Sequence, residues 1–333
     1  MYKDPQSIKV FISSHLPEIA IESLRNAGFS ATAWPHDWPM TQTELVQAAK
    51  KVNALLCIAA NKIDKAFLND CSHLEIISQF GAGYDNIDVS EATRLHIPIG
   101  NTPGVTSQAT ADIAFGLMIA VSRKMFYLHK TIGRGEWKYF IPKSNLGFEL
   151  KNKTLGIFGL GNIGLEVSKR CHGAYDMPII YHNRKPNTVA EKLYGARYVS
   201  FEELLHQSDV LSVHCSLNQE TKGIFNRSAF SKMKQTAIFI NTSRGLVHNE
   251  DDLIAALQAG EIWGAGLDVT NPEPMRADNP LLSMENVGIL PHIGSGTVET
   301  RSNMARLAAL NIIEIYKNDR IPCLVNPDYL KRI

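Results

Sequence analysis

The chain has 333 residues, of which 44% are hydrophobic and 20% charged, so it can bury a sizeable core and is long enough for about two domains. Its formal net charge is +1 at pH 7, and Lys and Arg are scattered along the sequence rather than clustered. This distribution excludes the basic footprint of a protein that binds nucleic acid or an anionic membrane, and favours work on small molecules.

The start of the chain and its cysteines predict a cytoplasmic protein. The segment MYKDPQSIKVF has no apolar signal-peptide core, and the longest apolar run, residues 113–121, is far short of a membrane span. The five cysteines are odd in number and lack C-x-x-C or Cys/His ligand spacing. They are therefore expected to be buried, reduced thiols, with neither a metal site nor disulfides.

In the first hundred residues, short apolar runs alternate with helical patterns. The runs IKVFIS, ALLCIAA and LEIISQF predict strands, and residues 17–26 predict a helix between the first two. This alternation is typical of parallel β/α layering. The segment TPGVTSQATADIAFGLMIAVSR follows, and its Pro/Gly start and apolar continuation predict a long helix over about residues 107–123 at a domain boundary.

A second series of six strand-like runs begins near residue 153, namely TLGIFG, MPIIYH, DVLSVHC, TAIFIN, WGAGLDV and NVGILP. Six strands is the number found in a doubly wound dinucleotide-binding domain. Helical patterns separate most of the runs. One of these helices has clear ends, because Asn249 can cap it with Asp252 three residues later and Gly260 can end it.

The last helical pattern covers about residues 297–317 and places Met304, Leu307, Ala308, Ile312 and Ile315 on one face. A lone helix cannot bury such a face, so it is expected to pack back on the N-terminal layer.

We therefore predict an α/β fold with two doubly wound parallel-sheet domains. A Rossmann NAD(P)-binding domain, residues 104–294, is inserted into a discontinuous flavodoxin-like substrate domain, residues 1–103 and 295–333.

The motif GLGNIG, residues 159–164, matches G-x-G-x-x-G and stands between the strand run TLGIF and the helical pattern NIGLEVSKRC. Glycine clusters also serve plain turns, but here Gly159 can make the tight turn, Gly161 can let the backbone approach a pyrophosphate, and Gly164 can let helix and sheet pack closely. The N–H groups of the helix start would face the anion. We predict dinucleotide binding, with Asn162 and Ile163 also in contact with the cofactor.

The strand run MPIIYH ends where an NAD-binding protein would offer an acid to the ribose, but Asn183, Arg184 and Lys185 follow instead. Without a carboxylate a 2′-phosphate is not repelled, and a guanidinium can bind it through two charge-assisted hydrogen bonds. This predicts NADPH as the preferred cofactor by about ten- to hundredfold over NADH, with NAD use also open. The alternative is that Arg184 is only a solvated loop charge.

Three polar residues, Arg244, Glu273 and His292, follow strand runs of the second series. Ligands of parallel α/β sheets bind outside the carboxyl ends of the strands, so these side chains can converge on a cofactor. An arginine can hold a carboxylate, a histidine can give a proton to a carbonyl oxygen as hydride arrives, and a glutamate can orient that histidine. Each residue alone has an ordinary structural interpretation, and their joint placement favours catalysis.

Taken together, GLGNIG, INTSRG followed by AGEIWGAGLDV, the NPEP turn and LPHIGSGT resemble the D-isomer-specific 2-hydroxyacid dehydrogenase family, most of all its glyoxylate and hydroxypyruvate reductase branch. FGAGYDNID and NTPGV also match, so the resemblance covers nearly the whole chain. It implies an NAD(P)-dependent oxidoreductase that reduces a small 2-oxo acid to the D-2-hydroxy acid. One departure is Gly296 in GSGT, where alanine is usual.

The resemblance also implies roles for single residues. Arg244 would grip the substrate carboxylate, Glu273 would pair with His292, and His292 would be the acid in reduction and the base in oxidation. Asp268 would hold the nicotinamide carboxamide. Further contacts are implied for Ser216, Thr242 and Gly294 with the cofactor, and for the backbone of Ala82 and Gly83 with the substrate carboxylate.

Members of this family are usually homodimers built on the inserted domain. The segment GRGEWKYFIPKSNLGFEL, residues 133–150, would be the arm that embraces the partner. The arm residues around Trp137 and Phe140 vary within the branch, so they do not identify the substrate.

Several alternatives stay open. The 2-ketogluconate reductases share nearly every motif named above, whereas phosphoglycerate dehydrogenase lacks support because no extra anion site is visible. Formate dehydrogenase is disfavoured because its pattern has Gln at the position of Glu273. From a different class, a dinucleotide-sensing co-repressor would use the same fold to bind partners, although the intact Arg, Glu and His set favours an enzyme.

Overall fold

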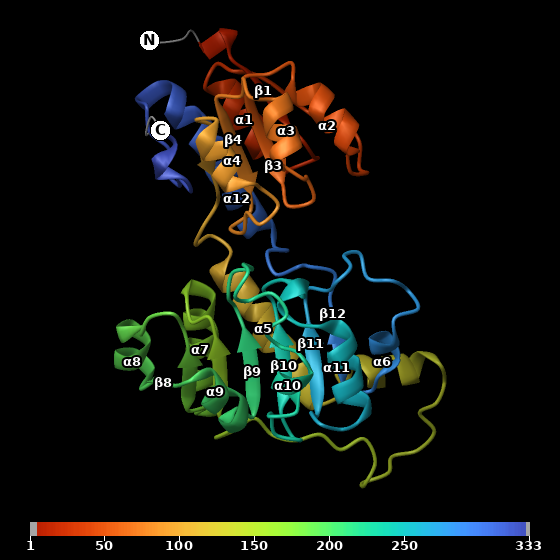
Figure 1. Cartoon of the computed structure of the whole chain (residues 1–333). Helices are drawn as coiled ribbons and strands as arrows, with labels where there is room; N and C mark the ends of the chain where they lie inside the picture. Colours follow the sequence, from red (N-terminus) through yellow and green to blue (C-terminus); the bar gives the residue numbers. More distant parts are fainter. Residues whose placement is uncertain (1–4, 331–333) are drawn as a thin grey trace. The chain divides into compact units, whose positions relative to one another are not determined.

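A computed structural model describes residues 5–330 and divides the chain into two compact units (Figure 1). The first unit runs up to Thr106 and resumes at Gly296, and the second unit is Ser107–Ser295. Throughout residues 5–330, every helix is too short or too polar to cross a membrane. Each unit is built on its own parallel sheet.

The first unit has a five-stranded parallel sheet in the order β2-β1-β3-β4-β5. This is the flavodoxin-like order, which confirms the predicted fold class of this unit. The strands are β1 (Lys9–Ile12), β2 (Ser30–Ala33), β3 (Ala54–Ile58), β4 (Ile76–Phe80) and β5 (Ile99–Gly100). Strands β2 and β5 were not predicted, because one is rich in Ser, Ala and Thr and the other has only two residues.

The helices of this unit are α1 (Ile19–Asn26), α2 (Gln42–Ala49), α3 (Lys65–Asp70), α4 (Val89–Arg94) and α12 (Val298–Asn318). The C-terminal helix α12 contacts α1 and β4, as predicted. Ala308 and Ile312 are buried in this contact, and Met304 on the same helix is buried as well. The Ser78 hydroxyl donates to the Ala308 carbonyl at 2.8 Å. The last helix therefore completes the core of the first sheet.

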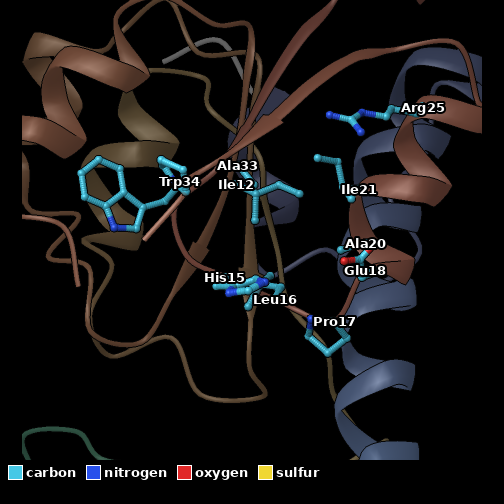
Figure 2. Close-up of a pocket in the computed structure, with 11 residues that line it drawn as sticks. Ile12, His15, Leu16, Pro17, Glu18, Ala20, Ile21, Arg25, Ala33 and Trp34 are labelled. Atoms are coloured by element: carbon cyan, nitrogen blue, oxygen red, sulfur yellow. The ribbon is translucent and has the colours of Figure 1, made fainter. Parts of the chain in front are cut away.

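A hollow of about 330 Å³ lies between β1, α1 and the end of β2 (Figure 2). Its wall is apolar at Ile12 and Ile21, with Trp34 and Arg25 on either side. The Arg25 guanidinium donates to the Ala31 carbonyl at 3.1 and 3.3 Å. These hydrogen bonds hold the turn between α1 and β2. Arg25, which lines this hollow, therefore has a structural role.

The second unit has a seven-stranded parallel sheet in the order β12-β11-β10-β9-β6-β7-β8. All six predicted strands are present: β6 (Leu155–Phe158), β7 (Ile179–His182), β9 (Val210–Val213), β10 (Ile238–Asn241), β11 (Gly264–Leu267) and β12 (Val287–Ile289). The predicted number is one short, because β8 (Arg197–Tyr198) adds an edge strand of two exposed residues with no apolar run to reveal it.

The helices of this unit are α5 (Ser107–Ser122), α6 (Met125–Gly133), α7 (Asn162–Tyr175), α8 (Thr188–Tyr194), α9 (Phe201–Gln207), α10 (Arg227–Phe230) and α11 (Glu250–Gln258). The predicted cap of α11 is confirmed, because the Asn249 side chain accepts from the Asp252 N–H and Gly260 follows the helix at φ +67°. Buried side chains of α5 pack against β10 and β11.

Candidate active site

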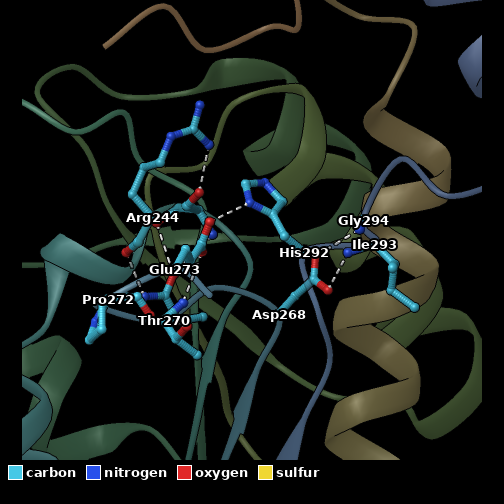
Figure 3. Close-up of polar contacts among 10 residues, drawn as sticks. Arg244, Asp268, Thr270, Pro272, Glu273, His292, Ile293 and Gly294 are labelled. Atoms are coloured by element: carbon cyan, nitrogen blue, oxygen red, sulfur yellow. Dashed lines mark hydrogen bonds and ion pairs between the residues drawn. The ribbon is translucent and has the colours of Figure 1, made fainter. Parts of the chain in front are cut away.

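The three predicted catalytic residues follow three neighbouring strands of the second sheet (Figure 3). Arg244 follows β10, Glu273 follows β11 and His292 follows β12. These strands are parallel, so their carboxyl ends lie along one edge of the sheet. The sheet order brings together residues that are far apart in the sequence.

His292 and Glu273 form a hydrogen-bonded pair, with 2.9 Å between the imidazole Nδ1 and the carboxylate Oε2. The other carboxylate oxygen, Oε1, accepts from the Thr270 N–H at 3.0 Å. Because the carboxylate is an acceptor, Nδ1 must carry the proton, and Nε2 is left to face a ligand. With His292 42% and Glu273 39% exposed, the pair is open to small molecules.

Burial opposes ionisation of Glu273, but hydrogen bonds from His292 and Thr270 outweigh it, so the pKa of this carboxyl lies below its usual value. Glu273 is therefore an anion at neutral pH. An anion at this distance fixes the direction and the tautomer of the His292 ring. A histidine held in this way can serve as a general acid in carbonyl reduction.

Arg244 lies in a loop that touches the segment carrying Glu273. One guanidinium nitrogen, Nη1, donates to the Ser243 carbonyl at 2.8 Å. At the next residue, Gly245, an added Cβ would lie 2.0 Å from the Thr270 carbonyl oxygen. The two loops thus meet backbone to backbone, and only glycine allows this approach.

Asp268 holds the turn that carries His292. Its two carboxylate oxygens accept from the Ile293 N–H at 2.8 Å and the Gly294 N–H at 2.7 Å. Asp268 is 1% exposed, and burial raises the pKa of its carboxyl although the two N–H groups act in the opposite direction. A Cβ on Gly294 would lie 3.0 Å from Asp268 Oδ2, so the turn is closely fitted to this carboxylate.

The glycine loop, residues 159–164, has the geometry that a dinucleotide requires. Gly159 has φ +90°, and a Cβ there would lie 2.6 Å from the Cys215 nitrogen, so the turn needs glycine. A Cβ on Gly161 would meet open space, which leaves room for a ligand against the backbone. Gly164 is tightly packed, because its Cβ would lie 3.1 Å from Ile157.

The predicted cofactor residues Asn162 and Ile163 are the first two residues of α7, whose first-turn N–H groups have no intrahelical acceptor. Beside the glycine loop lies a hollow of about 820 Å³, lined in part by Arg184, Lys185, Ser216 and Glu220. A helix start, a glycine loop and a roomy hollow at the strand ends fit a bound dinucleotide.

Asn183, a predicted cofactor residue, lines the hollow beside the glycine loop and also holds that loop in place. Its side chain accepts from the Leu160 N–H at 2.6 Å and donates to the Leu160 carbonyl at 3.1 Å. Asn187, which the sequence analysis missed, donates to the same carbonyl at 3.0 Å. Both amides thus hold the glycine loop in place, while Arg184 and Lys185 are exposed at the hollow.

Thr242 and Ser216 each make a hydrogen bond close to the dinucleotide hollow. The Thr242 hydroxyl lies 3.0 Å from His214 Nδ1, and His214 Nε2 lies 2.8 Å from the Ser212 hydroxyl. Burial lowers the pKa of His214 to about 3, so this histidine is neutral. The Ser216 side chain lines the dinucleotide hollow, and its carbonyl accepts from Thr221 at 2.8 Å.

Ala82 and Gly83 belong to the first unit, in the loop that follows β4. The Asn101 side chain donates to the Ala82 carbonyl at 2.8 Å, and the Thr102 N–H donates to the Gly81 carbonyl at 2.9 Å. The loop is therefore held from the end of β5. The predicted catalytic residues and the predicted cofactor residues all lie in the second unit.

Two buried residues near Arg244, Asn241 and His248, were missed by the sequence analysis. Asn241 is fully buried and His248 is 2% exposed. An asparagine directly after the apolar run IFI was the available signal, because a buried amide must find hydrogen-bond partners nearby.

Residues 115–294 match the family model described as "D-isomer specific 2-hydroxyacid dehydrogenase, NAD binding domain". The chain is 42% identical to a glyoxylate reductase of Thermococcus litoralis over 97% of this chain and 98% of the relative. It is 38% identical to a probable 2-ketogluconate reductase of Dictyostelium discoideum over 94% of this chain and 93% of the relative. The structure of the NADPH-dependent glyoxylate/hydroxypyruvate reductase of Sinorhizobium meliloti with NADP and malonate matches with a TM-score of 0.86 and 28% identity, over 99% of both chains.

Proposed function

Because this chain belongs to the D-isomer specific 2-hydroxyacid dehydrogenase family, we propose that it reduces the 2-carbonyl of glyoxylate or hydroxypyruvate to the D-2-hydroxy acid. The chain is an NAD(P)-dependent enzyme of the glyoxylate reductase type. The observation that carries the proposal is the 2.9 Å His292–Glu273 pair, together with an arginine in the loop after the adjacent strand β10. An acid, its orienting carboxylate and a carboxylate-binding group are what this reaction requires.

In the proposed reaction, Arg244 binds the substrate carboxylate and sets the position of the neighbouring carbonyl. When bound, the reduced nicotinamide would supply a hydride to the carbonyl carbon. His292 donates a proton from Nε2 to the carbonyl oxygen, so the carbon gains a hydrogen and the oxygen becomes the hydroxyl group. Glu273 accepts from Nδ1 of the imidazole throughout and so keeps Nε2 directed at the carbonyl oxygen. In oxidation His292 accepts the proton instead. Direct substrate contacts of Ala82 and Gly83 stay a prediction.

For the cofactor, we propose that Arg184 binds the 2′-phosphate of NADPH, with Lys185 as a second positive charge. Both are exposed at the dinucleotide hollow directly after β7, and the segment 183–186 has no carboxylate. Glu220 lines the same hollow and brings one negative charge to it, which limits the preference. A charge-assisted bond to the phosphate contributes about 1.5 to 3 kcal/mol, equivalent to about ten- to hundredfold in affinity.

The test of cofactor choice is Arg184→Ala. Lys185→Ala, which removes the neighbouring positive charge, is the comparison variant. Arg184→Ala should raise the KM for NADPH and leave the KM for NADH nearly unchanged. Asn183 is left intact in this test, because Asn183→Asp would remove the donor to the Leu160 carbonyl and disturb the glycine loop itself. An unchanged ratio of NADPH to NADH use in Arg184→Ala would contradict the assigned role.

We further propose that the protein is a homodimer in which residues 133–150 contact the partner. Between α6 and β6 the chain exposes Trp137 by 70%, Tyr139 by 79% and Phe140 by 86%. Large aromatic side chains at this exposure are typical of an interface rather than of a solvated loop. Sedimentation of the wild-type protein and of a Phe140→Ser variant distinguishes a dimer from a monomer.

The activity is tested by initial rates of NADPH and NADH oxidation with glyoxylate, hydroxypyruvate and 2-ketogluconate. We expect the fastest rates with NADPH and the two small acids. Faster turnover of 2-ketogluconate would keep the chemistry and change the substrate, in line with the Dictyostelium relative. Tight cofactor binding without turnover of any acid would refute the proposal and favour a dinucleotide-sensing co-repressor-like protein.

A further inference from the structure

The last residue of β10, Asn241, uses its whole side-chain amide on the loop that carries Arg244. Its oxygen accepts from the Ser243 N–H and from the Ser243 hydroxyl, both at 2.9 Å. Its nitrogen donates to the Arg244 carbonyl at 2.9 Å and lies 3.0 Å from His248 Nδ1. Two donors and two acceptors is the full capacity of such an amide, so this buried group is completely satisfied.

The orientation of this amide follows from the backbone. The Ser243 N–H can only donate, so it must meet the oxygen of Asn241, and the Arg244 carbonyl can only accept, so it must meet the nitrogen. The second hydrogen of that nitrogen then points at His248 Nδ1, which must act as an acceptor. His248 is therefore neutral, with its proton on Nε2, and burial lowers its pKa to about 4.

His248 is itself fixed by the surrounding core. It is 2% exposed and packs edge-on against Phe239 at 5.8 Å between ring centroids, and its backbone pairs with Phe225. His248 Nε2 is buried with no partner within residues 5–330, so Nδ1 makes the ring's polar contact to Asn241. The ring thus serves as a rigid acceptor that holds Asn241 in one position.

We propose that Asn241 and His248 are positioning residues that fix the backbone on both sides of Arg244 and so direct its guanidinium toward the substrate carboxylate. Asn241 accepts from the N–H of Ser243, the residue before Arg244, and donates to the carbonyl of Arg244 itself. Its contacts therefore lie on both sides of the Arg244 Cα. This proposal rests on the carboxylate-binding role proposed for Arg244. Neither residue touches the substrate in this arrangement, so both act through the position of the Arg244 guanidinium, which is called the clamp below.

The experiment uses Asn241→Asp and a matched pair at His248. Asn241→Asp keeps the shape but loses both donors and faces the Arg244 carbonyl with a negative charge. His248→Asn can place a side-chain oxygen close to the position of Nδ1 and keep the acceptor, whereas His248→Leu removes it. For each protein we would measure kcat and KM for glyoxylate, the Kd of NADPH, the Kd of oxalate for the NADPH-loaded enzyme, and the melting temperature.

Oxalate is a non-reducible carboxylate of the same size, so its binding reports on the clamp without turnover. Asn241→Asp and His248→Leu should each raise the KM for glyoxylate and the Kd of oxalate by about 10- to 100-fold, the scale expected for a misplaced binding group. NADPH binding should stay close to that of the wild type, and His248→Asn should stay close to the wild type in every measurement.

The outcomes distinguish a failure of the positioning proposal from a failure of the proposed function. If the wild type turns over glyoxylate and His248→Leu binds oxalate as tightly as His248→Asn, the positioning proposal is wrong and the proposed function stands. The same holds if both His248 variants lose oxalate affinity equally, in step with their melting temperatures, because that is a general loss of packing. A wild type that binds NADPH but neither reduces glyoxylate nor binds oxalate would overturn the function of the site and this proposal with it.

Discussion

Replacing Gly245 by alanine tests whether the Arg244 loop and the Glu273 segment act as one unit. A Cβ at position 245 would lie 2.0 Å from the Thr270 carbonyl oxygen and 2.2 Å from its carbon. Carbon atoms in ordinary contact are about 3.5 to 4.0 Å apart, so one of the two segments must move by more than about 1 Å. Both neighbours are backbone, so no flexible side chain can yield.

Either movement separates Arg244, the proposed carboxylate-binding residue, from the proposed acid–base pair, because Arg244 precedes Gly245 and the Thr270 N–H holds Glu273. A displacement of about 1 Å at a catalytic group can cost on the order of 100-fold in rate. Overpacking of this kind also destabilises a protein by about 1 to 3 kcal/mol. We therefore expect Gly245→Ala to fold, to melt at a lower temperature, and to lose about two orders of magnitude in kcat/KM for glyoxylate.

The assay is steady-state reduction of glyoxylate with NADPH, together with thermal unfolding. Gly173→Ala is the matched control, because Gly173 is an exposed residue within α7 whose added Cβ would meet open space. This control should keep full activity and gain about 0.5 to 1 kcal/mol of stability. A Gly245→Ala enzyme with wild-type kcat/KM would refute the coupling of the two loops.

Three further changes have distinct expected results. Arg244→Ala should lower kcat/KM for glyoxylate by about 10²-fold or more, on the scale of about 1.5 to 3 kcal/mol per charge-assisted bond lost, and a normal kcat/KM would contradict the clamp. Gly159→Ala should weaken NADPH binding measured by fluorescence titration, because its Cβ would meet the Cys215 backbone at 2.6 Å, and unchanged affinity would argue against the glycine loop as the phosphate site. The pKa of His248 is lowered by burial to about 4, so the unfolded chain takes up this proton more readily than the folded one, and stability is lost as the pH falls from about 6.5 toward 4. At pH 5 the free energy of unfolding should be lower by about 2 kcal/mol. His248→Asn should not show this loss when urea unfolding is compared at pH 7 and pH 5.

The convergence of the three proposed catalytic residues could be predicted from the sequence because local signals mark them. Arg244, Glu273 and His292 follow apolar strand runs, and the ends of parallel strands meet at one edge of the sheet. The glycine motif could also be placed, because it stands between a strand and a helix. Each of these predictions needs only the order of elements and the rule for parallel sheets.

The supporting contacts could not be predicted, because they depend on which backbone atoms approach one another in space. The packing of Gly245 on Thr270 joins segments 25 residues apart, and nothing local to either one reveals it. Asn183 was assigned to the cofactor from its place after β7, and nothing in the sequence reveals that its amide also holds Leu160 of the glycine loop. The edge strand β8 has too few residues to produce a periodic pattern.

The central claim, that His292 is the proton donor in the reduction of a small 2-oxo acid, is tested most directly by His292→Ala. The measurement is kcat for glyoxylate with NADPH, alongside the Kd of NADPH for the same variant. The account predicts a loss of about 10² to 10⁴ in turnover, the usual contribution of a general acid, with NADPH binding nearly intact. Turnover close to that of the wild type would remove His292 from the mechanism and contradict the account.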